Sequence, residues 1–254
     1  MPRRNDKTKL KKTRIDTVLV DRGFFVSREQ AQRAIMAGEV RVGEAVVDKA
    51  SVKIEPEATI TVDSSPAYVG RGGLKLEGAL RHFAIAVTGF TALDIGASTG
   101  GFTDCLLQKG AKKVYAIDVG HGQLAWKIRN DPRVVVREKL NARYLSRADV
   151  PEPIDLCVID VSFISLTLIL PNAFESVTAN GMTLALIKPQ FELQASDVGS
   201  GGIVREPALH AKAQEKIRQF VVNAGHEAIG IVPSEITGTD GNQEFFICVR
   251  KQSA

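Results

Sequence analysis

The stretch LDIGASTGGFTDCLL, residues 93–107, carries the sharpest local signal in the chain. A short apolar strand ends at Ile95, a tight turn runs from Gly96 to Gly101, and a helix follows. Glycines let the backbone approach a ligand closely, and the start of the helix offers free N–H groups. The Gly-x-Gly-x-x-Gly spacing of dinucleotide-binding turns is absent, and Asp94 would repel a pyrophosphate. We therefore predict that this turn binds a cationic ligand.

Strands and helices alternate on both sides of this turn. Two apolar runs near the C-terminus, 226–236 and 244–251, are separated only by TGTDGNQ, which predicts an antiparallel hairpin at a sheet edge. The earlier runs have helical stretches between them, which predicts a parallel sheet covered by helices on both faces. The expected fold is α/β, a Rossmann-like sheet of the class I methyltransferase type, mostly parallel with an antiparallel last strand. The expected parallel strands are 91–95, 113–118, 134–138, 155–160 and 183–187.

Polar residues after the next two strands complete a predicted cofactor site. Asp118 ends the second strand, where an acid can accept both ribose hydroxyls of an adenosine, and Asn141 follows the third strand, where it can flank the adenine. With Asp94, this pattern favours S-adenosylmethionine, which carries an ammonium and a sulfonium and no phosphate. A doubly wound fold that binds another nucleotide is the alternative. The predicted cofactor residues are Asp94, Gly96, Ala97, Ser98, Gly100, Gly101, Phe102, Asp118, Val119 and Asn141.

Four polar residues occupy positions where an apolar residue or a turn would be ordinary. Lys75 lies in a glycine-rich helix, Asp160 and Lys188 end the fourth and fifth strands, and Glu244 begins the last strand. Ligands of open α/β sheets bind outside the carboxyl ends of the strands. A structural ion pair explains any one of these residues equally well. Together they suit methyl transfer to a ribose hydroxyl, because a lysine can accept the proton or stabilise the alkoxide while the acids orient the lysines.

The N-terminal quarter holds all of the excess positive charge. Residues 1–62 contain 13 Lys and Arg against 9 Asp and Glu, whereas residues 63–254 contain 20 of each. Residues 1–13 form a basic arm, which is as typical of a solvated tail as of a nucleic-acid contact. Residues 14–62 predict two short helices followed by short strands, a small α+β domain. Residues 63–69 are expected to be a linker, and residues 70–254 the catalytic domain.

The stretch RIDTVLVDRGFFVSREQAQRAIMAGEVRVGEAVVDKAS resembles the RNA-binding domain named after small-subunit ribosomal protein four. The Ser-Arg-x-x-Ala helix start and the Gly-x-Val-x-Val strand carry the resemblance. It implies binding to structured RNA through Arg28, Arg33 and neighbouring basic residues. The predicted RNA-binding residues of this domain are Arg14, Arg28, Arg33 and Arg41.

The whole chain from about residue 14 resembles the TlyA family, also called haemolysin A, which joins such a domain to an FtsJ-like methyltransferase. The motifs YVGRGGLKLEGAL, DVSFISL, IKPQFE, GGIVR and GNQEFF carry this resemblance, together with the stretch around the glycine-rich turn. It implies 2′-O-methylation of a cytidine in ribosomal RNA, with ribosomal subunits as partners. It also implies a catalytic set of Lys75, Asp160, Lys188 and Glu244, and a loop in which Phe163 stacks on the target base or packs in the core.

Several other classes of function are less well supported. DVSF is a distant variant of the loop of amino-methyltransferases, but it lacks both prolines of that loop. A pore-forming haemolysin needs secretion or an amphipathic insertion segment, and neither is recognisable. A vestigial enzyme that only binds RNA would have lost the glycines or the acid–lysine set. We expect a cytoplasmic protein without a signal peptide, membrane span or metal site, whose three cysteines are reduced and buried.

Overall fold

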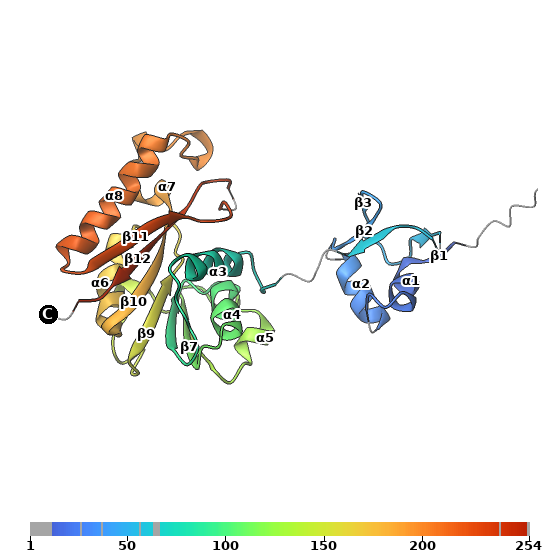
Figure 1. Cartoon of the computed structure of the whole chain (residues 1–254), viewed down its shortest axis with the longest axis horizontal. Coiled ribbons are helices and arrows are strands. Elements are labelled where there is room, and N and C mark those ends of the chain that lie inside the picture. The colour runs from blue at the N-terminus through green and yellow to red at the C-terminus, as the bar shows by residue number, and fades with distance from the viewer. Residues whose placement is uncertain are drawn as a thin grey trace, which may run out of the picture. The chain divides into compact units, whose positions relative to one another are not determined.

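The computed structural model describes residues 12–25, 27–36, 38–55, 57–62, 67–238 and 240–252, and it divides into two units at Ala67 and Tyr68 (Figure 1). Each unit has a hydrophobic core of its own, so each is described by itself. The predicted basic arm lies outside the described residues except for its last two, Lys12 and Thr13.

The smaller unit packs two helices against short antiparallel strands. Ile15, Leu19 and Ile35 project from one face of each helix into a core closed by Val40 and Ile60. Gly23 and Gly38, which follow the two helices, adopt positive φ angles of 77° and 75°, as expected of glycines that end helices. The elements are β1 (Thr13–Arg14), α1 (Ile15–Asp21), α2 (Arg28–Met36), β2 (Val40–Val42), β3 (Ala45–Val46), β4 (Lys53–Ile54) and β5 (Ile60–Val62), with sheet orders β1-β4 and β3-β2-β5.

A buried carboxylate holds the helices of the smaller unit together. The side chain of Asp16 is inaccessible to solvent and accepts hydrogen bonds from Arg14 at 2.9 Å, Arg28 at 2.7 Å and Gln32 at 2.8 Å. The Arg14 guanidinium, followed by those of the other donors, holds the pKa of Asp16 well below its usual range. Two of the predicted RNA-binding arginines are therefore also structural, although both guanidinium groups stay about half exposed.

Replacing Asp16 with Asn should destabilise the smaller unit by about 1–3 kcal/mol, because charge-assisted hydrogen bonds are lost in a buried place. Because the folded state lowers the pKa of Asp16, its contribution is present near neutral pH and disappears as acid protonates it. Hydrogen–deuterium exchange over residues 12–62 of the full chain measures the effect. Asp48→Asn, at an exposed position, is the control and should leave exchange unchanged. Equal protection in both variants would contradict the structural role of Asp16.

The larger unit is a seven-stranded sheet with helices on both faces. Its strand order is β11-β12-β10-β9-β6-β7-β8, in which β12 is antiparallel to both of its neighbours and the remaining pairs are parallel. The predicted fold class is confirmed. The elements are α3 (Gly72–His82), β6 (Thr91–Ile95), α4 (Gly101–Gln108), β7 (Lys113–Asp118), α5 (Trp126–Arg129), β8 (Val134–Glu138), β9 (Ile154–Ile159), α6 (Leu170–Ser176), β10 (Val177–Ile187), α7 (Pro189–Glu192), α8 (Pro207–Asn223), β11 (Glu227–Pro233) and β12 (Phe245–Arg250).

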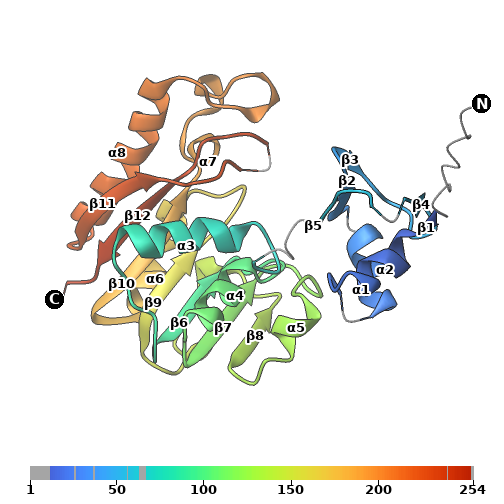
Figure 2. The ribbon, with the colours of Figure 1, turned by 45° about the vertical axis from the view of Figure 1, so that its right-hand side comes forward.

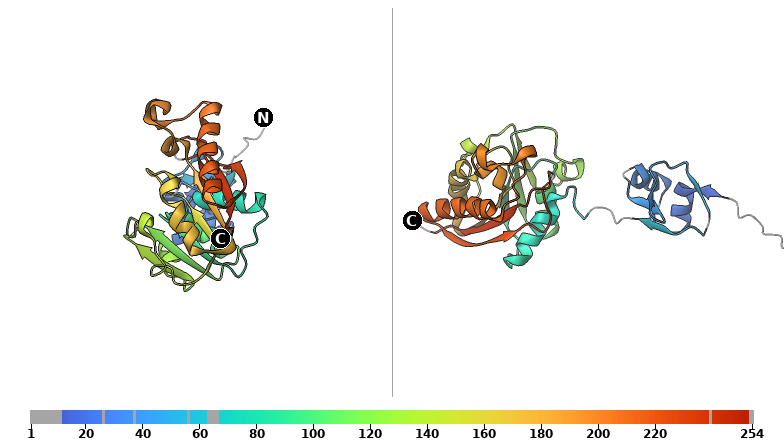
Figure 3. Two further views of the ribbon diagram at one scale, coloured as in Figure 1. Left: turned by 90° about the vertical axis from the view of Figure 1, so that its left-hand side faces the viewer. Right: turned by 90° about the horizontal axis from the view of Figure 1, so that it is seen from above.

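Alternating strand residues build the two cores of this unit. In β6, Ala92 faces α3 and α4, whereas Leu93 and Ile95 face the layer that contains α6 and α8. Figures 2 and 3 show α3 and α4 on one side of the sheet and α6 and α8 on the other. Cys105, Cys157 and Cys248 are all buried and unpaired. Among the described residues, no helix is long and apolar enough to cross a membrane.

Two boundaries differ from those expected. The strand expected at 183–187 is the last part of β10, which begins at Val177 and passes an irregularity before Met182, where Asn180 has a φ of 63°. The segment expected as a linker over 63–69 also ends early. Tyr68 is buried in the core beside α3 and α4, and the Val69 N–H donates to Asp104 at 2.9 Å. The larger unit therefore begins at Tyr68, because that ring packs in its core.

Candidate active site

Two adjoining cavities open at the carboxyl ends of the parallel strands. The larger, of about 520 Å³, lies between the ends of β6, β7 and β9. The smaller, of about 200 Å³, lies between the turn after β6, α3 and the strand ends at Lys188 and Glu244. Gly96, Ser98 and Asp160 line both cavities. A ligand that fills the larger cavity therefore lies against groups that face the smaller one.

Close backbone packing shapes the turn between these cavities. Gly96 has a φ of 86°, and a Cβ atom there would stand 2.1 Å from the carbonyl oxygen of Asp160. No side chain fits in that space. Gly101 begins α4, and a Cβ atom at this position would lie 3.0 Å from the backbone nitrogen of Gly73 at the start of α3. These two glycines allow strand, turn and both helices to meet at one place.

The predicted cofactor residues divide between the two cavities. Gly96, Ser98, Asp118, Val119 and Asn141 line the larger cavity, and Ala97, Gly101 and Phe102 line the smaller one together with Gly96 and Ser98. Gly100, with a φ of 97°, is the N-cap of α4 and lines neither. The Asp118 carboxylate accepts backbone N–H groups of Ser98 and Gly120, both at 2.7 Å. These bonds fix the carboxylate at the cavity wall.

Asp94 lies beneath the turn and does not line either cavity. Its carboxylate is fully buried, with one oxygen accepting the Thr103 hydroxyl at 2.6 Å. The other oxygen, Oδ1, has no hydrogen-bond partner among the described residues. Burial, and to a lesser extent the nearby negative charges of Asp160 and Asp118, raises the pKa of Asp94 to about 7. Asp94 can thus act on a ligand through its charge but not by direct contact in this arrangement.

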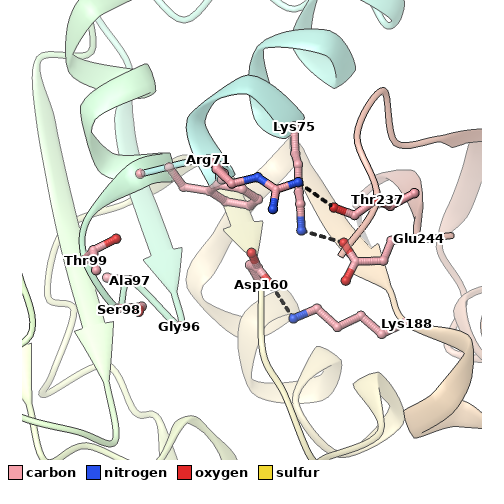
Figure 4. Close-up of a pocket in the computed structure, with 13 residues that line it drawn as sticks. Arg71, Lys75, Gly96, Ala97, Ser98, Thr99, Asp160, Lys188, Thr237 and Glu244 are labelled. Carbon is pink, nitrogen blue, oxygen red and sulfur yellow. Dashed lines mark hydrogen bonds and ion pairs between the residues drawn. The ribbon is translucent and has the colours of Figure 1, made fainter. Parts of the chain in front are cut away.

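The four predicted catalytic residues converge on the smaller cavity as two ion pairs (Figure 4). The ammonium of Lys188 lies 2.7 Å from Asp160, and that of Lys75 lies 2.6 Å from Glu244. Both lysines are only 9% exposed and Glu244 is 3% exposed. Buried charges of this kind are tolerated because each is paired. Figure 4 shows all four side chains directed into the same space from different elements.

Three further residues belong to this cavity and were not predicted. Ser162 accepts a hydrogen bond from the Lys188 ammonium at 2.9 Å. Arg71, at the start of α3, lines the cavity and donates to the carbonyl of Thr237 at 3.4 Å. Ser162 lies in the quoted motif DVSFISL and Arg71 in YVGRGGLKLEGAL, but a serine or arginine in a loop has no distinctive spacing. Their proximity appears only when the strand ends are brought together.

Comparisons with known proteins agree with this geometry. The FtsJ-like methyltransferase family matches residues 68–251, and the S4 domain matches residues 13–60. The chain belongs to the FtsJ-like methyltransferases that carry an S4 domain, the TlyA family. It is 49% identical to the putative rRNA methyltransferase YqxC of Bacillus subtilis, over 93% of this chain and 85% of that protein.

Two other relatives are similar over nearly the whole chain. The 16S/23S rRNA (cytidine-2′-O)-methyltransferase TlyA of Mycobacterium tuberculosis is 44% identical, over 96% of this chain and 91% of that protein. A solved structure described as a putative hemolysin from Streptococcus thermophilus matches with a TM-score of 0.74 and 43% identity, covering 96% of this chain and 90% of that chain. The predicted membership of the TlyA family is confirmed.

Phe163 of this methyltransferase lies at the mouth of the larger cavity. Its side chain is 90% exposed, so the alternative that it packs in the core is wrong. Its backbone adopts a φ of 64°, which is uncommon for a residue other than glycine. The ring makes a tilted contact with Phe191, with centroids 5.1 Å apart. The loop therefore presents an aromatic face beside the cavity, where a base can stack.

Glu192 ties the two catalytic loops of the methyltransferase together. Its buried carboxylate accepts the Ser165 hydroxyl at 2.6 Å and the Leu166 N–H at 2.7 Å, both in the loop after Asp160. The Lys216 ammonium, from α8, lies 2.9 Å from the same carboxylate. Because Glu192 ends α7, the helix that follows Lys188, it fixes the Lys188 segment against the Asp160 segment. Sequence analysis quoted the motif IKPQFE but assigned this acid no role.

We predict that Glu192→Gln lowers the rate of methyl transfer by between about 10-fold and about 100-fold, because the two loops that carry Asp160 and Lys188 lose a fixed spacing. A single-turnover assay with the full chain measures the rate. Glu215→Gln removes an exposed ion pair with Arg218 on α8 and serves as the control that should keep the normal rate. A wild-type rate in the Glu192 variant would show that the loops hold their places without it.

Proposed function

We propose that this protein uses S-adenosylmethionine to methylate the 2′-hydroxyl of a cytidine in ribosomal RNA. The observation that carries the proposal is the convergence of two buried lysine–carboxylate pairs on a cavity that adjoins the predicted cofactor cavity. The printed activity of the M. tuberculosis relative supports the choice of cytidine and of the ribose oxygen. A cytoplasmic location follows from this substrate.

The residues of the larger cavity fit the proposed cofactor. Asp118 stands where it can accept ribose hydroxyls, and the unpartnered Asp94 Oδ1 supplies negative potential that suits a cation. No side chain fits at Gly96, which leaves the turn open to a ligand. These features disfavour a phosphorylated ligand, because two carboxylates would repel it. S-adenosylmethionine supplies an electrophilic methyl group bonded to a sulfonium.

The pKa of Asp94 predicts how cofactor affinity depends on pH. Because this pKa is raised to about 7, the carboxyl is neutral in mild acid and becomes ionised as the pH rises through that value. Affinity for a cationic cofactor should increase over this interval by about fivefold, for about 1 kcal/mol of partly screened attraction. Calorimetry on the wild-type protein and on Asp94→Asn measures it. The variant should lack this increase, and identical pH profiles would remove Asp94 from the cofactor site.

The two ion pairs divide the work at the ribose. Lys188, held by Asp160 and Ser162, is placed to accept the 2′-hydroxyl proton in its neutral form or to stabilise the alkoxide in its charged form. Lys75, held by Glu244, adds positive charge on the other side of the cavity and can hold the ribose in place. The protein thus activates and orients a poor nucleophile, which loses its proton as the O–CH₃ bond forms.

Replacing Lys188 with Ala should lower the rate of methyl transfer by about 10²–10⁴-fold, the usual range for acid–base help. Cofactor affinity should change little, because Asp94 and Asp118 contribute it. Arg at this position should not rescue the rate, because a guanidinium does not release its proton near neutral pH. Single-turnover kinetics and calorimetry separate the two effects. A near-normal rate with lost cofactor binding would place Lys188 in the cofactor site.

The direct test of the function is methylation of separated ribosomal subunits with labelled S-adenosylmethionine. Nuclease P1 digestion and mass spectrometry of the product should give 2′-O-methylcytidine. Methylation of an exocyclic amine would instead identify a base amino-methyltransferase. Absence of transfer to either subunit would overturn the choice of substrate.

The smaller unit is proposed to recruit structured RNA. Its match to the S4 domain supports this role, and Arg33 is an exposed cation on α2. Arg14 and Arg28 keep part of their guanidinium surface exposed beside Asp16, and Arg41 lies on β2. Phosphates can approach these groups without breaking the core of the unit.

A further inference from the structure

Two exposed aromatic side chains of the larger unit have no role in the proposed chemistry. Trp126 begins α5 and is 80% exposed, and Tyr144 ends a short 3-10 helix and is 72% exposed. Tryptophan is rarely so exposed in a protein surface that has no partner. Both side chains belong to the connections that leave the carboxyl ends of β7 and β8.

The same segment concentrates positive charge. Residues 119–147 contain seven Lys and Arg and only two acids, a balance of +5 in a region 63–254 whose overall balance is zero. Both acids are already paired within the segment, Asp131 with Arg133 and Glu138 with Arg129. Among the described residues, no carboxylate lies within ion-pair distance of Lys139 or Arg143. Lys127 is mostly exposed and lies 3.5 Å from Asp104.

These side chains border the two cavities. The N–H of Ala125, next to Trp126, donates to the carbonyl of Thr99, which lines the smaller cavity. Asn141 lines the larger cavity and caps the 3-10 helix that ends at Tyr144. The basic-aromatic rim is defined as Trp126, Lys127, Lys139, Arg143 and Tyr144. It lies beside the place where the target nucleotide must enter.

We propose that the basic-aromatic rim binds unpaired nucleotides of the RNA substrate next to the target, with Trp126 and Tyr144 stacking on bases and the three cations contacting phosphates. This inference rests on the proposed function, since it concerns the substrate of the same site. Aromatic rings interleaved with cations are the usual surface for single-stranded nucleic acid. A protein partner would favour an apolar centre with few lysines, which the rim does not have.

The first experiment uses Trp126 as its own reporter, because it is the single tryptophan of the chain. The full-length protein is titrated with oligocytidylate, and binding is followed independently by the anisotropy of a labelled oligocytidylate. Stacking should quench or shift the tryptophan fluorescence in step with binding. Tyr144→Ala should weaken binding by about tenfold, as expected for the loss of one stacked base. Binding without any change in tryptophan fluorescence would overturn the proposal.

The second experiment compares matched variants in the methylation assay. Trp126→Ala should raise the KM for RNA by about tenfold and leave cofactor affinity unchanged, whereas Trp126→Phe should keep most of the affinity. Ile229→Ala, at an exposed position on the edge strand β11, is the hydrophobic control. Equal KM values for Trp126→Ala and Ile229→Ala would contradict a stacking role.

The charged part of the rim is tested by salt dependence. Arg143→Gln should lower the slope of log affinity against log salt by about 0.7, the value for one phosphate contact on a single strand. Lys112→Gln is the control, because Lys112 is exposed just before β7, at the opposite edge of the sheet. A protein that methylates neither subunit would refute the proposed function, while the fluorescence titration would still decide the role of the rim. Normal methylation with unaffected rim variants would refute the rim alone.

Discussion

Gly96 and Asp160 follow adjacent parallel strands, and their backbones approach so closely that no side chain fits at position 96. The Asp160 N–H donates to the carbonyl of Ile95 and continues the pairing of β6 with β9 past the last strand residue. This contact places Asp160 in the wall that both cavities share. The cofactor cavity and the catalytic cavity can therefore communicate only because a glycine occupies this position. The pairing of β6 with β9 fixes the geometry of both.

The buried ion pairs show how the methyltransferase accommodates charge inside a mostly apolar unit. Lys75 and Glu244 come from a helix and a strand that are 169 residues apart in the chain, yet their charged groups meet at 2.6 Å. Each lysine alone would be costly to bury, and each pair is weak evidence for added stability. Their retention at the carboxyl edge of the sheet fits a catalytic purpose better than a structural one.

Much of the fold could be predicted because its strands are apolar runs with polar residues at their ends. Asp160, Lys188 and Glu244 were recognisable as site residues for the same reason, since each stands directly beside a strand end. Which lysine pairs with which acid could not be read, because the pairing depends on the order of strands in the sheet. The position of Asp94 was also missed in part. Its place before the turn suggested contact with the ligand, but the strand carries the side chain into the core.

Other features depend on packing that leaves no local pattern. Tyr68 looked like part of a linker because its neighbours are small and polar, and only its burial against α3 and α4 assigns it to the larger unit. The start of β10 was hidden by Asn180 and Gly181, which resemble a turn and instead lie within an irregular strand. Glu192 resembles any surface acid until Ser165 and Lys216 are brought to it.

The loop that carries Phe163 is anchored on both sides of that residue, by Ser162 to Lys188 and by Ser165 to Glu192. These anchors hold the backbone at a positive φ, which an unrestrained phenylalanine rarely adopts. The cost of arranging the ring is thus met when the protein folds and not when RNA arrives. A ring held in this way loses little conformational entropy on contact, so its selectivity comes from the shape and unpairing of the base. The same anchors make the ring's position answer to the state of the catalytic lysine.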